Sequence, residues 1–293
     1  MKPFFQDWGF FRRLSSLIVI MLLLTLIFVV VSLGLAILIY GQKQVNAMEV
    51  QVLQFTQGVL SFGMFILPSA LFAYLFENHN IFKGLSMSEK PKLIHIGICI
   101  LMFFVSIPLI SYLEEINLKM QLPQWMSGIE QWMRTHEEQA KIATEKLLGE
   151  PGINALISNI IVIALIPAIG EELLFRATLQ KNIFQNSTKI QPYISVIIVA
   201  ILFSTFHLQF YGFLPRFVLG TMLGLLFLLT KNIWVPISYH FINNFIAVMV
   251  SHTDANETVH AEPQFIAHPL IIILSLLATI SIIYLLYKTE KKH

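Results

Sequence analysis

The sequence is short of charge. Only 12% of its 293 residues are charged, whereas 56% are hydrophobic and the mean hydropathy is +0.72. Globular domains typically contain ~25% charged residues. The 19 basic and 17 acidic side chains are too few to cover a soluble protein of this size without large exposed apolar patches. This scarcity excludes a soluble globule and indicates an integral membrane protein.

Two further scarcities exclude particular kinds of site and of partner. Cys99 is the only cysteine, which excludes an internal disulfide and a four-cysteine metal site. The net charge is only +2 and the chain has no long basic run, so we expect no nucleic acid among its partners.

Long apolar runs, by contrast, are abundant. A helix needs ~20 residues to cross the hydrocarbon of a bilayer, and lipid leaves no hydrogen-bond partner for a free backbone group. Because the runs are continuous rather than alternating, they predict helices. We therefore expect an all-α, polytopic membrane protein with about eight transmembrane helices, at residues 14–40, 53–76, 93–112, 153–180, 192–208, 213–230, 233–251 and 265–287. The short runs 192–208 and 213–230 can alternatively form one re-entrant pair.

The positions of Lys and Arg predict the topology. With the N-terminus inside, 13 of the 19 basic residues fall in the inner segments. Because inner loops carry an excess of Lys and Arg, this split predicts a multi-pass protein of the cell membrane with both termini in the cytoplasm. No linker or repeat divides the chain, so residues 1–293 are expected to form a single integral membrane domain.

Residues 113–152 make up the one sizeable polar segment. Within it, Trp125, Ile129 and Trp132 recur at helical spacing, and Pro123 suits the start of a helix. The pattern predicts an amphipathic helix on the membrane surface. Two roles stay open for it: a lid over the path of a substrate, or a plain interfacial connector.

Ionisable residues inside the apolar runs are functional candidates, because a charge at the bilayer centre costs at least ~2.5–3.5 kcal/mol. The first such group is Glu171-Glu172-x-x-x-Arg176. On a helix Glu172 and Arg176 share a face, whereas Glu171 points about 100° away. Glu171 is therefore a candidate general base. The alternative is a buried Glu–Arg pair that only holds helices together.

Two more polar groups follow, in the runs 192–208 and 233–251. Phe203 and His207 are four residues apart, and so are His240 and Asn244. A histidine can hold a water molecule or a metal, and a His–Asn pair can supply two donors to an oxyanion. Each group alone is equally compatible with hydrogen bonding between helices. Together, a carboxylate pair, a histidine and a His–Asn pair on three of four successive runs favour an enzyme.

The ordered motifs resemble the CPBP family of intramembrane proteases, which includes the CAAX prenyl endopeptidases and the Abi proteins. The resemblance covers residues 153–251, which would be the catalytic core helices. It implies an all-helical fold with a site inside the membrane, and hydrolysis of a peptide bond in a membrane-associated protein or peptide.

The resemblance also implies roles for the motif residues. Glu171 and His207 would activate water, while His240 and Asn244 would stabilise the oxyanion. Glu172, Arg176 and Phe203 would support the site. The family is commonly described as metalloproteases; if a divalent metal binds, the resemblance points to Glu171, His207 and His240 as ligands, and zinc suits that set.

Two points stand against this interpretation. Counted from Lys189, His207 lies ~27 Å into the membrane, whereas Glu171 counted from Lys181 lies ~15 Å in. His207 can reach the other residues only if its helix tilts or begins outside the lipid. Buried Glu and His also build proton relays, so a proton-coupled transporter is the alternative from another class, beside a catalytically silent membrane scaffold or immunity protein.

Overall fold

The computed structural model describes residues 4–5, 7–77, 79–185, 191–254 and 268–291. Every element in these ranges is helical, which confirms the predicted all-α class. Segments η1, η3 and η4 are π-helical, and η2 and η5 are 3-10 turns. The elements in chain order are α1 (Phe10–Tyr40), α2 (Gln42–Asn46), α3 (Val50–Ser61), η1 (Phe62–Ile66), α4 (Leu67–Phe76), α5 (Ile81–Gly84), α6 (Leu93–Leu118), η2 (Gln124–Met126), α7 (Ser127–Leu148), α8 (Ile153–Asn159), η3 (Ile160–Leu165), α9 (Ile166–Glu172), η4 (Leu173–Gln185), α10 (Pro192–Phe206), η5 (Phe210–Gly212), α11 (Phe213–Thr230), α12 (Trp234–Asp254) and α13 (Pro269–Glu290).

Within the described residues, six helical segments are long and apolar enough to cross a membrane, so the chain is a polytopic membrane protein. They correspond to six of the eight predicted spans. The other two predicted spans are also helical. Helix α10 is apolar but has only 15 residues, and α12 has 21 residues but carries several polar side chains. The six are Phe10–Tyr40, Val50–Phe76, Leu93–Leu118, Ile153–Gln185, Phe210–Thr230 and Pro269–Glu290.

Two helices run further than their apolar runs. The helix predicted at 93–112 continues to Leu118, and the one predicted at 153–180 continues to Gln185. Both predictions stopped at polar side chains, whereas the backbone hydrogen bonds of a helix do not depend on side-chain polarity. The predicted amphipathic helix is confirmed as α7, which follows Pro123 and a 3-10 turn.

Some predictions fall partly outside the described residues. Residues 265–267 open the last predicted span, and Lys2, Lys189 and Lys292 belong to the inner basic set, but none of these is described. The side of the membrane on which each terminus lies stays a prediction.

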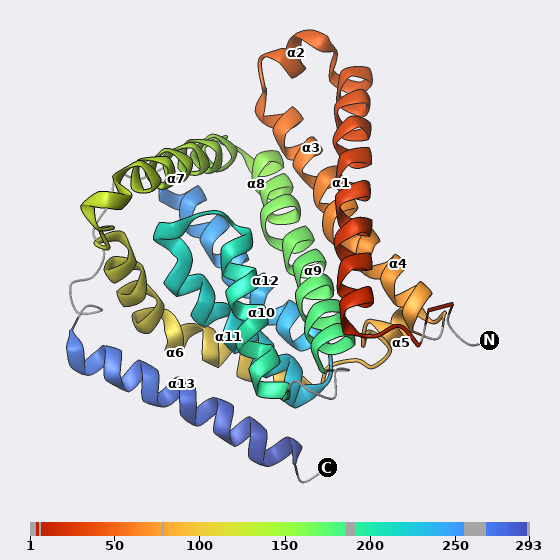
Figure 1. The fold of residues 1–293 in the computed structure, drawn as a ribbon. Coiled ribbons are helices and arrows are strands. Elements are labelled where there is room, and N and C mark those ends of the chain that lie inside the picture. Colours follow the sequence, from red (N-terminus) through yellow and green to blue (C-terminus); the bar gives the residue numbers. More distant parts are fainter. Residues whose placement is uncertain (1–3, 6, 78, 186–190, 255–267, 292–293) are drawn as a thin grey trace.

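The helices form a bundle with a projecting hairpin (Figure 1). Helices α1 and α3 make the hairpin and pack on each other, and the chain returns through η1 and α4 onto α9 and η4. Helix α12 packs on η3, α9, α6 and α11, α10 packs on α11 and η4, and α13 packs on α6. Helix α7 crosses one end of the bundle between α6 and α8 (Figure 1). The three motif-bearing segments are therefore neighbours in the middle of the bundle.

Glycines allow two close approaches beside these motifs. A Cβ at Gly170 would lie 2.9 Å from Cβ of Phe65, so η1 can approach α9 only because this residue has no side chain. A Cβ at Gly220 would lie 3.1 Å from Cδ1 of Phe203 and 3.3 Å from Cα of Ala200. These contacts fix α9 and α10 beside their neighbours and so position the residues that follow.

Candidate active site

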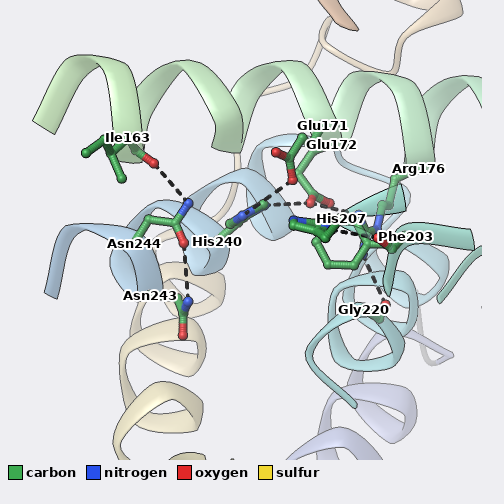
Figure 2. Close-up of polar contacts among 10 residues, drawn as sticks. All are labelled: Ile163, Glu171, Glu172, Arg176, Phe203, His207, Gly220, His240, Asn243 and Asn244. Carbon is green, nitrogen blue, oxygen red and sulfur yellow. Dashed lines mark hydrogen bonds and ion pairs between the residues drawn. The ribbon is translucent and has the colours of Figure 1, made fainter. Parts of the chain in front are cut away.

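Three neighbouring segments bring the predicted residues into one region (Figure 2). The continuous helix α9–η4, the end of α10 and the middle of α12 contribute them. Phe203 and Arg176 are fully buried or nearly so, whereas the side chain of Glu171 is 14% exposed. The residues concerned are Glu171, Glu172 and Arg176 from the first, Phe203 and His207 from the second, and His240 and Asn244 from the third.

A buried ion pair anchors the region. Nη1 of Arg176 donates to Oε1 of Glu172 at 2.9 Å, and both side chains have no exposed surface. Nη2 of Arg176 donates to the carbonyl of Gly220 at 3.2 Å, and its guanidinium lies 4.7 Å from the centroid of the Phe203 ring. The pair thus ties η4 to α11 and α10. Removing one partner of such a pair would leave an uncompensated buried charge.

His240 lies between the two adjacent carboxylates. Its Nδ1 donates to Oε1 of Glu172 at 2.9 Å, and its Nε2 lies 3.9 Å from Oε2 of Glu171. Oε1 of Glu172 therefore accepts hydrogen bonds from both Arg176 and His240. Within the part of the chain that the structure describes, Oε2 of Glu171 is buried and accepts no hydrogen bond. That atom is available to a water molecule or a substrate.

His207 directly follows the last residue of α10. It contacts the cluster through the carbonyl and the ring of Phe203. Its Nδ1 donates to the carbonyl of Phe203 at 2.8 Å, because a carbonyl can only accept. In the neutral imidazole Nε2 is then the acceptor. The Phe203 ring contacts both imidazoles edge-on, with centroids 5.0 Å from His207 and 6.0 Å from His240. One aromatic ring therefore lies against both histidines.

Asn244 lies one turn beyond His240 on α12. Its Nδ2 donates to the carbonyl of Ile163 at 3.2 Å, and its Oδ1 accepts from Nδ2 of Asn243 at 3.3 Å. These bonds hold its amide against η3 (Figure 2). An amide group has two hydrogens, so one N–H of Asn244 is left for a ligand.

The expected mismatch in the depth of His207 does not arise. The estimate started from Lys181, but η4 continues to Gln185, 14 residues beyond Glu171. Helix α10 runs 15 residues from Pro192 to Phe206, with His207 next. Counted from the connection between the two helices, Glu171 lies 14 residues from Gln185 and His207 lies 15 residues from Pro192, so both are at similar distances along their helices. Neither a strong tilt nor a start outside the lipid is needed.

The metal interpretation has less support. Among the described residues, no three side chains of His, Cys, Asp or Glu are arranged so that they could hold one metal ion. Nδ1 of His240 is engaged by Glu172 and Nδ1 of His207 by a carbonyl, which leaves both Nε2 atoms free, as is usual in metal-binding histidines. What a three-ligand zinc site lacks among the described residues is a suitable placement of three such side chains.

Sequence reasoning missed three backbone contributions. The carbonyl of Gly220 accepts from Arg176, and four residues later the carbonyl of Gly224 accepts from Nε2 of Gln180 at 3.0 Å. A signal was present, because Gly-x-x-x-Gly in an apolar helix indicates close helix packing. The carbonyl of Ile163, which holds Asn244, carries no signal in the sequence.

The architecture defines the class of protein: an all-α, polytopic membrane protein whose buried helices share a carboxylate–histidine cluster. The comparison with known protein families gives a more specific result. Residues 153–246, about a third of the chain, match the family described as Type II CAAX prenyl endopeptidase Rce1-like. Residues 153–246 are thus similar to an Rce1-like domain of the CPBP family. Comparisons with curated proteins and with solved structures found no match.

Proposed function

We propose that the protein is an intramembrane endopeptidase that hydrolyses a peptide bond in a membrane-associated protein or peptide. The observation that carries the proposal is Oε2 of Glu171, which is buried within 3.9 Å of Nε2 of His240 and accepts no hydrogen bond from the described residues. Oε2 of Glu172 also accepts none, but Oε1 of Glu172 is engaged by both Arg176 and His240, so Glu171 is the carboxylate that is left to act as a general base. The match of residues 153–246 to a protease family agrees with this interpretation.

Glu171 activates the water. Oε2 of Glu171 accepts no hydrogen bond from the described residues, so it can accept one from a water molecule. Glu171 takes a proton from the water as its oxygen attacks the peptide carbonyl. His207, with Nδ1 engaged by Phe203, offers Nε2 as a second acceptor that orients the water.

His240 and Asn244 stabilise the oxyanion. Glu171 and Glu172 carry two negative charges and Arg176 carries one positive charge, so a protonated His240 makes the cluster neutral. In that state Nε2 of His240 donates, together with the second amide hydrogen of Asn244. The C–O bond forms as the carbonyl electrons move onto oxygen. The intermediate then collapses, the C–N bond breaks, and Glu171 returns its proton to the leaving amine.

The predicted topology would expose this site from within the bilayer. We propose a multi-pass protein of the cell membrane with both termini in the cytoplasm, supported by the distribution of Lys and Arg. Residues 153–251 would be the catalytic core helices of a single integral membrane domain. Its substrate would then reach the site with at least one part in the lipid.

The test is cleavage by purified protein. Full-length protein in detergent micelles is incubated with a library of prenylated and unprenylated peptides, and the products are read by mass spectrometry. We expect cleavage by the wild type, and a loss of at least ~100-fold in kcat for Glu171→Gln and for His207→Ala, because each removes a group that handles the water. Glu138→Gln is the matched control, since this carboxylate is exposed on α7.

Cleavage that survives both substitutions would contradict the assignment. Proton flux into liposomes that disappears with Glu171→Gln would favour the transporter instead. A further set of assays, with the chelator EDTA, tests whether cleavage needs a metal ion. We expect cleavage to persist in EDTA, because the described ligands do not form a three-ligand site. Loss of activity that zinc restores would show that this expectation is wrong.

A further inference from the structure

The loop that follows His207 is strained at its first residue. Leu208 has φ of 54°, in the left-handed region that a residue with a side chain seldom enters. Its side chain is 62% exposed, so packing of Leu208 itself does not compensate for the strain. Such a conformation persists only when the surroundings hold it. The orientation of His207 therefore depends on contacts made by the residues after it.

Helix α7 makes two of those contacts through one carboxylate. Oε1 of Glu137 accepts from Nε2 of Gln209, and Oε2 accepts from the backbone N–H of Tyr211, both at 3.3 Å. One turn earlier, the guanidinium of Arg134 lies 4.7 Å from the centroid of the Tyr211 ring. Glu137 is separated from these residues by more than 70 positions in the sequence, so the contacts tie two distant segments together.

The start of α7 is itself held. Glu130 accepts from Arg134 at 2.6 Å and from the backbone N–H of Leu122 at 3.2 Å. The hydrogen bond from Arg134 keeps the pKa of Glu130 below its ordinary value, so Glu130 is ionised at neutral pH. These bonds keep the guanidinium of Arg134 over the ring of Tyr211. They also fix the start of α7, the helix that carries Glu137.

The other side of the loop rests on α6 and α11. Nδ2 of Asn117 donates to the carbonyl of Phe210 at 2.9 Å, and Oδ1 of Asn117 accepts from the backbone N–H of Leu214 at 2.7 Å. Nη2 of Arg216 donates to Oε1 of Gln209 at 2.6 Å. Gln209 thus lies between Arg216 and Glu137. The loop has a buried support on one side and a partly exposed one, Glu137, on the other.

From these contacts we infer that Glu137 is a positioning residue: it holds residues 209–211 and thereby fixes His207 for its role in the proposed hydrolysis. This inference rests on the proposed function. It also assigns a role to α7, for which the sequence left a lid and a plain connector as alternatives. In the structure α7 supports residues 209–211, the loop that follows His207, through the carboxylate of Glu137.

The experiment compares Glu137→Ala and Glu137→Gln with Glu138→Ala, an exposed carboxylate next in the sequence. In full-length protein in detergent, kcat and KM are measured on a peptide that the wild type cleaves. Amide hydrogen exchange is measured over residues 207–213. For Glu137→Ala we expect faster exchange at Tyr211, kcat lower by ~10–100-fold, and KM within about twofold, because misplacing a reacting group mainly costs rate. Glu137→Gln keeps one acceptor and should lose less, and Glu138→Ala should match the wild type.

A fourth variant separates positioning from a merely structural role. In a His207→Ala background, Glu137→Ala should leave the residual rate unchanged, since its effect passes through His207. An additional loss there, wild-type kcat for Glu137→Ala, or unchanged exchange at Tyr211 would each overturn the inference. If the wild type cleaves no peptide, the proposed function fails, and the exchange measurement still decides whether Glu137 holds the loop. If Glu137→Ala does not fold, the isosteric Glu137→Gln carries the test.

Discussion

Helix α1 and segment η4 differ in what surrounds them. Over the 31 residues of α1 only Arg13, Leu17, Ser32 and Ala36 are buried, and its large apolar side chains are mostly exposed. Over the 13 residues of η4, all but Lys181 and Gln185 are buried, including several polar side chains. Both belong to segments long and apolar enough to cross a membrane.

The difference shows how lipid as a solvent changes the rule for burial. Apolar side chains of α1 need no protein partner, because lipid is as apolar as they are. Polar side chains of η4 find no partner in lipid, so they must find one inside the protein. The buried polar side chains of η4 therefore depend on their protein partners more than the apolar side chains of α1 do. Substitutions of the buried polar groups should cost more stability than substitutions on α1.

The largest effect is expected at Arg176. Arg176→Met removes the buried guanidinium that pairs with the fully buried carboxylate of Glu172, and we expect a loss of about 3–5 kcal/mol in the free energy of unfolding, measured in detergent with SDS as denaturant. Arg12→Met, at an exposed position of α1, is the matched control and should change little. Equal stability of the two variants would remove the basis of the comparison. Adding Glu172→Gln to Arg176→Met should recover part of the loss.

A smaller effect is expected at a helix contact. Gly220→Leu places atoms where a Cβ alone would lie 3.1 Å from Phe203, and overpacking of this kind costs about 1–3 kcal/mol. Gly34→Leu on α1 is the same substitution at a position where, among the described residues, a Cβ would meet no heavy atom within 4 Å. It should be neutral or stabilising, because glycine is a poor helix former. Thermal unfolding in micelles measures both, and a costly Gly34→Leu would contradict the picture of α1 as lipid-facing.

The smallest effect concerns a hydrogen bond between the hairpin and the bundle. Nε2 of Gln54 on α3 donates to Oδ1 of Asn159 on α8 at 2.8 Å, and both side chains are buried. A double-mutant cycle with Gln54→Ala and Asn159→Ala should give a coupling of about 0.6 kcal/mol, the average for such bonds in membranes. A coupling indistinguishable from zero would mean that the hairpin is held without this bond.

Sequence reasoning identified these polar residues as a group because lipid makes polar side chains conspicuous. Ionisable groups in apolar runs stood out, and the structure places them around Phe203 and His240. They are Glu171, Glu172, Arg176, His207 and His240. The amphipathic pattern likewise located α7, whose start at Ser127 follows Pro123 closely.

Other features depended on contacts that the sequence does not encode locally. Nothing around Glu137 indicates that its carboxylate meets the backbone of Tyr211, because the partner is a main-chain N–H far along the chain. The π-helical stretches η3 and η4 also escape pattern reasoning, which assumes the spacing of an α-helix throughout. For that reason the facing of residues beyond Arg176 could not be read from an i,i+4 rule.

The side chain of Phe203 connects the basic groups of the cluster. Its face carries the guanidinium of Arg176 and its edges meet the imidazoles of His207 and His240, while its backbone carbonyl holds Nδ1 of His207. Three basic groups from three segments therefore share one rigid spacer. A displacement of Phe203 would therefore disturb the surroundings of all three groups at once, so a change of size at this one position should affect the whole cluster rather than one side chain.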